Sequence, residues 1–192
     1  GPFSLAAHLA DPSNILRLII KSPETVHEFS KIATDIIAEY ANAMFDHGAD
    51  VVVVEDMVAS VDLLGPDFYV KFAAPYDKEL ISKLKGPNVL HICGDADPII
   101  DEMIKTGTDC ISIDSKSNIE NAVIKSKGRA SVLGNVDAVT NLLRGSDEDV
   151  RNDTLSVMKA GVKLVAPSCS ISPLTPTKNI KVMVDTVTGK TA

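Results

Sequence analysis

Short apolar runs alternate with helix-forming stretches along almost the whole of this chain of 192 residues. Five runs are short and rich in apolar, often β-branched residues, as buried strands are; they lie at residues 50–55, 88–93, 110–114, 130–134 and 162–166. Between them, apolar residues recur at helical spacing over residues 23–47, 66–85, 97–106, 119–127, 147–160 and 179–187. Strands that alternate with helices predict an α/β fold in which helices cover a parallel sheet.

The type of parallel sheet follows from where the polar residues fall. No Gly-x-Gly-x-x-Gly follows any of the strands, which argues against a dinucleotide-binding sheet. Polar residues instead recur at the carboxyl ends of several strands, as in a (β/α)₈ TIM barrel. A barrel needs eight strands and about 250 residues, whereas this chain has five strands and a partial one near its start. We therefore expect residues 1–192 to form a single domain, the carboxy-terminal part of a barrel whose amino-terminal βα units are missing.

Two potential metal ligands stand two positions apart in the second strand. Residues i and i+2 of a strand point to the same face, so His91 and Cys93 can converge on one metal ion. Cys169 is the best third ligand, because it follows the apolar run at residues 162–166, where a strand gives way to a loop. One imidazole and two thiols with an open fourth position describe a catalytic zinc site that activates a thiol. Cys110, out of step with this site, is interpreted as a small buried hydrophobe.

Other polar residues at the strand ends are candidates for catalysis and substrate binding. Glu55 and Asp56 are consecutive, so only one of them can point into the barrel mouth. Asp114 could approach the metal as a displaceable fourth ligand, although a surface carboxylate would fit its position as well. Asn135 and Asp137 could offer polar groups to a substrate, and turn chemistry explains them almost as well. The catalytic candidates are thus Asp114 and Glu55.

Three cations lie near the strand ends, namely Lys116, Arg129 and Arg144. Any of them could hold an anion, and the sequence singles out none.

Charge and composition exclude several classes of protein. The net charge of −7 argues against a nucleic-acid-binding protein, which would normally carry a basic face. The sequence contains no apolar run of roughly 18 residues, as a membrane span needs, and no basic-then-apolar leader at its start. Three widely spaced cysteines do not form a disulfide framework and suit a reducing compartment. We expect a soluble, cytoplasmic protein that contacts neither nucleic acid nor membrane.

Several blocks of sequence, taken in order and with their spacing, resemble a known family. The blocks are Gly1-Pro2-Phe3-Ser4-Leu5-Ala6, His91-Ile92-Cys93-Gly94, Ile113-Asp114, Gly134-Asn135-Val136-Asp137, Pro167-Ser168-Cys169 and Pro173-Leu174-Thr175-Pro176-Thr177-Lys178-Asn179-Ile180. They resemble the uroporphyrinogen decarboxylase superfamily, and within it most closely the methylcobamide:coenzyme M methyltransferases of methanogenic archaea.

The resemblance implies a specific activity and specific partners. The methyltransferases carry zinc on a His-x-Cys pair and a distant cysteine, which match His91, Cys93 and Cys169 here, whereas the decarboxylases use no metal. Their reaction moves a methyl group from a methylcobamide, carried by a corrinoid partner protein, to the thiol of coenzyme M (2-mercaptoethanesulfonate) in methanogenesis. Zinc lowers the pKa of a bound thiol and so produces a thiolate near neutral pH. The methyl donor pathway, whether methanol, methylamine or methylsulfide, is left open.

Two alternatives remain at this point. The first is a metal-free decarboxylase of the same superfamily, with Glu55 or Asp56 as its acid. The second is an inactive barrel fragment that acts as a binding partner for a corrinoid protein.

Overall fold

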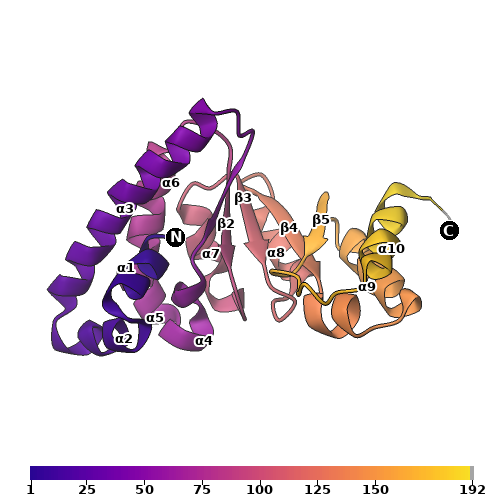
Figure 1. Cartoon of the computed structure of the whole chain (residues 1–192), viewed down its shortest axis with the longest axis horizontal. Coiled ribbons are helices and arrows are strands. Elements are labelled where there is room, and N and C mark those ends of the chain that lie inside the picture. Colours follow the sequence, from indigo (N-terminus) through magenta and orange to yellow (C-terminus); the bar gives the residue numbers. More distant parts are fainter. Residues whose placement is uncertain (191–192) are drawn as a thin grey trace.

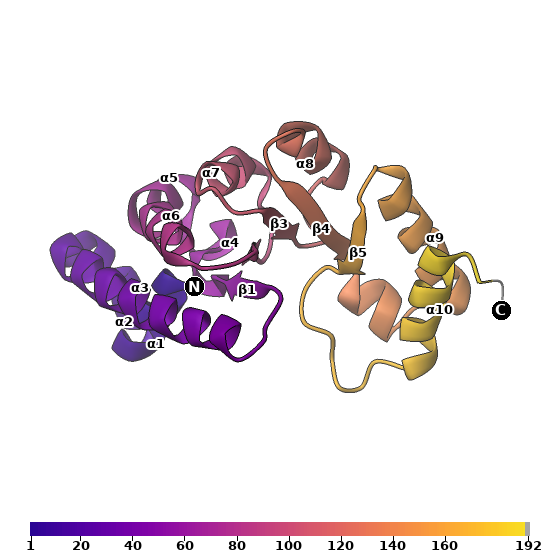
Figure 2. The same ribbon diagram turned by 90° about the horizontal axis from the view of Figure 1, so that it is seen from above.

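The computed structural model describes residues 1–190, and a parallel sheet lies at the centre of this part of the chain (Figure 1). Its five strands are β1 (Val52–Glu55), β2 (Asn88–Ile92), β3 (Cys110–Ile113), β4 (Ser131–Val136) and β5 (Leu164–Pro167). They lie side by side in chain order, and every neighbouring pair is parallel. The sequence predicted all five. Seen from above, the strands follow an arc with α6, α7 and α8 on its outer side, as consecutive βα units of a barrel do (Figure 2).

Helices occupy most of the remaining chain. The α-helices are α1 (Pro2–Ala10), α2 (Pro12–Lys21), α3 (Pro23–Asp46), α4 (Val61–Leu64), α5 (Pro66–Phe68), α6 (Ala74–Lys83), α7 (Ile100–Lys105), α8 (Ile119–Ser126), α9 (Asp147–Lys159) and α10 (Thr177–Thr188). Short 3₁₀ or π turns connect them at η1 (Met57–Ala59), η2 (Tyr69–Ala73), η3 (Asp97–Ile99) and η4 (Ala138–Leu143). The break predicted near Pro75 is present. The π turn η2 ends at Ala73, and α6 begins at Ala74 with Pro75 in its first turn.

The partial strand predicted near the start of the chain was wrong, because α1 and α2 occupy this region. Pro12 stands at the first turn of α2, and the Asp11 carboxylate accepts hydrogen bonds from the backbone N–H groups of the next turn. Ile15 and Ile19, four residues apart, bury the same face of the helix. An apolar run with this period packs as a helix rather than as a strand.

The carboxyl end of β1 is tied to the first helix by a buried carboxylate. Asp56 is fully buried and accepts hydrogen bonds from the backbone N–H groups of Phe3 (3.2 Å) and Ser4 (2.6 Å) and from the Ser4 hydroxyl. The negative charge therefore lies at the amino end of α1, where the helix dipole favours it. This contact turns Asp56 away from the inner face of the sheet and leaves that face to Glu55.

The apolar core lies between the sheet and its helices. Every residue of β2 and β3 is buried, whereas β1 and β5, at the two edges of the sheet, carry half-exposed apolar residues such as Val53 and Leu164. Within residues 1–190, no helix combines the length and the apolar character that crossing a bilayer requires.

Candidate metal centre

Three soft ligands converge at the carboxyl ends of β2 and β5. The ligand atoms of His91, Cys93 and Cys169 all lie within 4.8 Å of one another. The Cys93 Sγ is 3.3 Å from the His91 Nε2 and 3.4 Å from the Cys169 Sγ. Tetrahedral zinc with ordinary Zn–S and Zn–N distances would place such atoms about 3.5–3.8 Å apart. The donor set and its spacing therefore fit a single zinc ion.

Strand geometry delivers each of these side chains. His91 is buried in β2, and Cys93 follows it by two residues, so that both face the inside of the sheet. Cys169 lies just beyond β5, where the Ser168 N–H continues the strand ladder by donating to the Val136 carbonyl at 2.8 Å. The loop that carries the third ligand is thus anchored at the residue immediately before it.

A serine that the sequence analysis missed holds the histidine. The Nδ1 atom of His91 lies 2.9 Å from the Ser112 Oγ, and both residues are buried. Ser112 is the register partner of His91 across β2 and β3. The contact occupies the Nδ1 atom, and the Nε2 atom faces Cys93. Strand alternation puts Ser112 on the same face as Asp114, two positions further on, but only the register of β2 against β3 brings it to His91.

The electrostatic environment suits a bound cation. Burial lowers the pKa of His91, which favours the neutral imidazole that binds metals. Burial, together with the neighbouring Cys169 thiol, raises the pKa of Cys93 to about 12. Without a cation, the Cys93 thiol is therefore protonated at neutral pH. Burial also raises the pKa of Cys110 to about 11, and this thiol lies buried in β3, as expected of a residue that serves the core.

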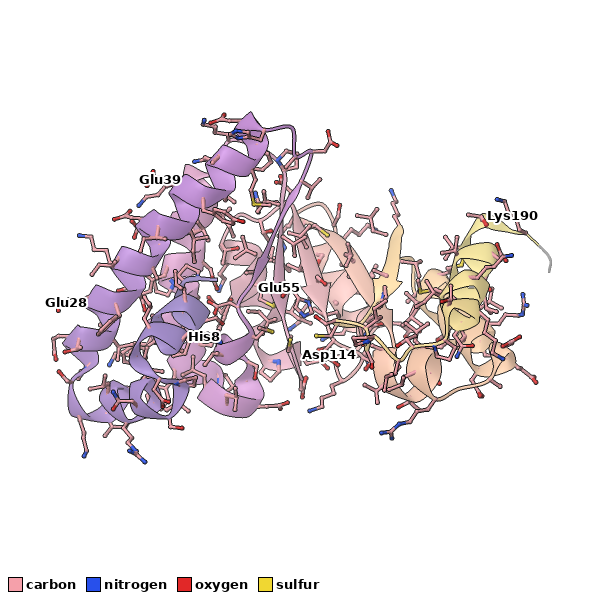
Figure 3. The ribbon with its side chains drawn as sticks, in the orientation of Figure 1. His8, Glu28, Glu39, Glu55, Asp114 and Lys190 are labelled. Atoms are coloured by element: carbon pink, nitrogen blue, oxygen red, sulfur yellow. The ribbon has the colours of Figure 1, made fainter. Side chains whose placement is uncertain are left out.

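Both predicted catalytic carboxylates lie beside the three ligands. Glu55 is the register partner of His91 and lines, with His91, Ser112 and Cys169, a cavity of about 180 Å³. The Asp114 carboxylate accepts a hydrogen bond from the Gly94 N–H at 3.3 Å, next to Cys93. Figure 3 shows the two labelled carboxylates near the middle of the molecule. Of the consecutive acids, Glu55 faces the site and Asp56 does not, so the prediction that only one could do so is confirmed.

Asn135 and Asp137 line a different cavity, of about 390 Å³, between the loop after β3 and α9. The Asn135 amide donates to the backbone carbonyl of Asp114 at 3.0 Å. The Asp137 carboxylate caps η4 by accepting from the backbone N–H groups of Val139 and Thr140. Asn135 therefore supports the loop that carries Asp114. The structure does not bring either residue to His91, Cys93 and Cys169, and substrate binding by them stays a prediction.

The three candidate cations differ in position, and Arg144 lies at the carboxyl end of η4. Lys116 follows β3 at the ligand end of the sheet, and its Nζ lies 2.8 Å from the Asp62 carboxylate. Arg129 lies at the opposite end, between α8 and the start of β4, where it pairs with Asp101. Arg129 is thereby removed from consideration as an anion-binding group of this site.

A barrel-like parallel sheet with a polar centre at the carboxyl ends of its strands is typical of TIM-barrel enzymes. Comparison with known families identifies the family. The family model described as uroporphyrinogen decarboxylase (URO-D) matches residues 1–189. The chain belongs to this family, as its sequence blocks had indicated.

Individual proteins of this family are also similar to the chain. The chain is 36% identical to methylcobamide:CoM methyltransferase MtbA of Methanosarcina acetivorans and 32% identical to MtaA of Methanosarcina barkeri, over 96% of this chain and 55% of each relative. A solved methyltransferase from Methanosarcina mazei superposes with a TM-score of 0.95 at 31% identity, over 98% of this chain and 56% of that one. The chain thus spans about half the length of these relatives.

Proposed function

We propose that this protein is a zinc-dependent methyltransferase, which moves a methyl group from a methylcobamide on a corrinoid partner protein to the thiol of coenzyme M. The observation that carries the proposal is the convergence of His91, Cys93 and Cys169 within 4.8 Å. Three donors would leave the fourth position of a tetrahedral zinc ion open. The names of the relatives contain methylcobamide and CoM, and this supports the choice of these two substrates.

The residues of the site have separable roles in such a reaction. His91, Cys93 and Cys169 would hold the ion. Zinc, when bound, lowers the pKa of a substrate thiol, so that the thiolate is present near neutral pH. Glu55 and Asp114 lie beside the ligands and are the proposed acceptors of the proton that the thiol releases. The cavity beside Glu55 provides space for a small thiol next to the ligands.

Two further features separate this proposal from a metal-free decarboxylase. Asp56, one of the two acids considered for that reaction, is buried against α1 and hydrogen-bonded by its backbone. Two thiols and an imidazole within contact distance have no role in a reaction that needs only a carboxylate. In a metal-free decarboxylase, Glu55 alone would have to serve as the acid. The zinc proposal predicts instead that Glu55 supports no reaction in the metal-free protein.

A methyl-transfer assay tests the proposal. Zinc-loaded protein is mixed with coenzyme M and either free methylcobalamin or a methylated corrinoid protein, and methylated coenzyme M is measured. We expect product with the wild type and with Cys110→Ser, whose thiol lies outside the ligand set, and none with Cys93→Ser. Zinc binding without any methyl transfer would refute the catalytic proposal and favour a binding role for the chain.

A further inference from the structure

The contact between His91 and Ser112 has a chemical consequence that depends on which nitrogen carries the proton. A neutral imidazole has one N–H group and one nitrogen with a free lone pair. The Ser112 hydroxyl can either accept from Nδ1–H or donate to an unprotonated Nδ1. Only the first arrangement leaves the lone pair on Nε2, the nitrogen that faces Cys93 at 3.3 Å.

We propose that Ser112 is a positioning residue, which accepts a hydrogen bond from His91 Nδ1–H and so presents Nε2 to the metal site. The inference rests on the proposed zinc site. Both side chains are almost completely buried, His91 at 4% and Ser112 at 5% exposure, and the Ser112 hydroxyl is the protein group that Nδ1 contacts. The parallel register of β2 and β3 places the two residues opposite each other. Partners of this kind, which bind the outer nitrogen of a ligating histidine, orient the ring and fix its tautomer.

The chain offers a rescue variant and a matched control for a test. Ser112→Ala removes the hydroxyl, and Ser112→Thr keeps it, with a methyl group that the adjoining cavity of about 180 Å³ can receive. Ser126→Ala is the control, because Ser126 is equally buried but its Oγ has no hydrogen-bond partner within residues 1–190. We expect zinc to bind roughly 10- to 100-fold more weakly to Ser112→Ala, as for other outer partners of metal ligands. Ser112→Thr and Ser126→Ala should retain the wild-type affinity.

Two measurements are combined. Zinc affinity is measured by competition with a chromophoric chelator, and the His91 tautomer is measured in the metal-free protein from the ¹⁵N chemical shifts of the imidazole ring. The wild type and Ser112→Thr should show a protonated Nδ1, and Ser112→Ala should show a larger share of the Nε2–H tautomer.

The outcomes distinguish this inference from the zinc proposal itself. A wild-type protein that binds no zinc would refute the zinc site, whatever Ser112 does. A wild type that binds zinc, with Ser112→Ala unchanged in both affinity and tautomer, would refute the role of Ser112 alone. Weaker zinc binding that Ser112→Thr does not restore, with an unchanged tautomer, would also overturn it, because that pattern indicates a packing defect.

Discussion

Asp77 provides a prediction about stability that follows directly from burial. This carboxyl group in α6 is fully buried, and its Oδ2 accepts one long hydrogen bond, at 3.4 Å, from the Tyr69 hydroxyl. Its Oδ1 has no partner among residues 1–190. Burial, first, and the charge of nearby Asp56, second, raise the pKa of Asp77 well above its usual range. The native state therefore holds a proton that the unfolded chain releases.

The sign and size of the effect follow from this difference. Above the unfolded pKa of about 3.9, the unfolded state loses the Asp77 proton while the folded state keeps it. Stability therefore falls as the pH rises, by about 1.4 kcal/mol per pH unit, until the raised folded pKa is reached. Asp77→Asn removes this titration and should make the protein more stable at neutral pH.

Urea denaturation at a series of pH values measures the difference. The free energy of unfolding of Asp77→Asn minus that of the wild type should grow as the pH rises from about 4, with a slope near 1.4 kcal/mol per unit. Asp67→Asn, a change at an exposed carboxyl group, is the matched control and should leave the pH dependence unchanged. Parallel stability curves for the wild type and Asp77→Asn would refute the reasoning.

Two other perturbations test the geometry of the metal site and the contact that ties β1 to α1. Mild oxidation of the metal-free protein with hydrogen peroxide should link Cys93 to Cys169, whose Sγ atoms lie 3.4 Å apart, while Cys110 stays free; peptide mapping would reveal the disulfide, and an unlinked pair would contradict the geometry. Asp56→Ala should lower the free energy of unfolding by about 1–3 kcal/mol, because it leaves buried donors of α1, including the Ser4 N–H, without an acceptor. An unchanged denaturation midpoint would show that this contact contributes nothing.

The sheet could be predicted from the sequence because its signal is local. Runs such as residues 51–54 are apolar and β-branched, which favours a strand, although β1 lies at an edge of the sheet and leaves Val53 half-exposed. The start of the chain was harder, since its apolar residues also form a dense run. The spacing of Ile15 and Ile19 and the cap at Asp11 decide there in favour of helices.

The convergence of His91, Cys93 and Cys169 was likewise predictable, whereas the residues that support this cluster were not. His91 and Cys93 share a face by strand alternation alone, and Cys169 follows a recognisable strand. Ser112 acquires its role only through the register of β2 against β3, which the sequence does not state. Asn135 shows the same limit, because its amide supports a loop 21 residues away in the chain.

The central claim is that His91, Cys93 and Cys169 hold a zinc ion, and metal content tests it most directly. Protein purified under reducing conditions with zinc present is dialysed, and its zinc is measured by elemental analysis beside Cys169→Ser and Cys110→Ser. The proposal predicts close to one zinc per chain in the wild type and in Cys110→Ser, and a large loss in Cys169→Ser. A wild type without zinc, or equal zinc in all three proteins, would contradict it.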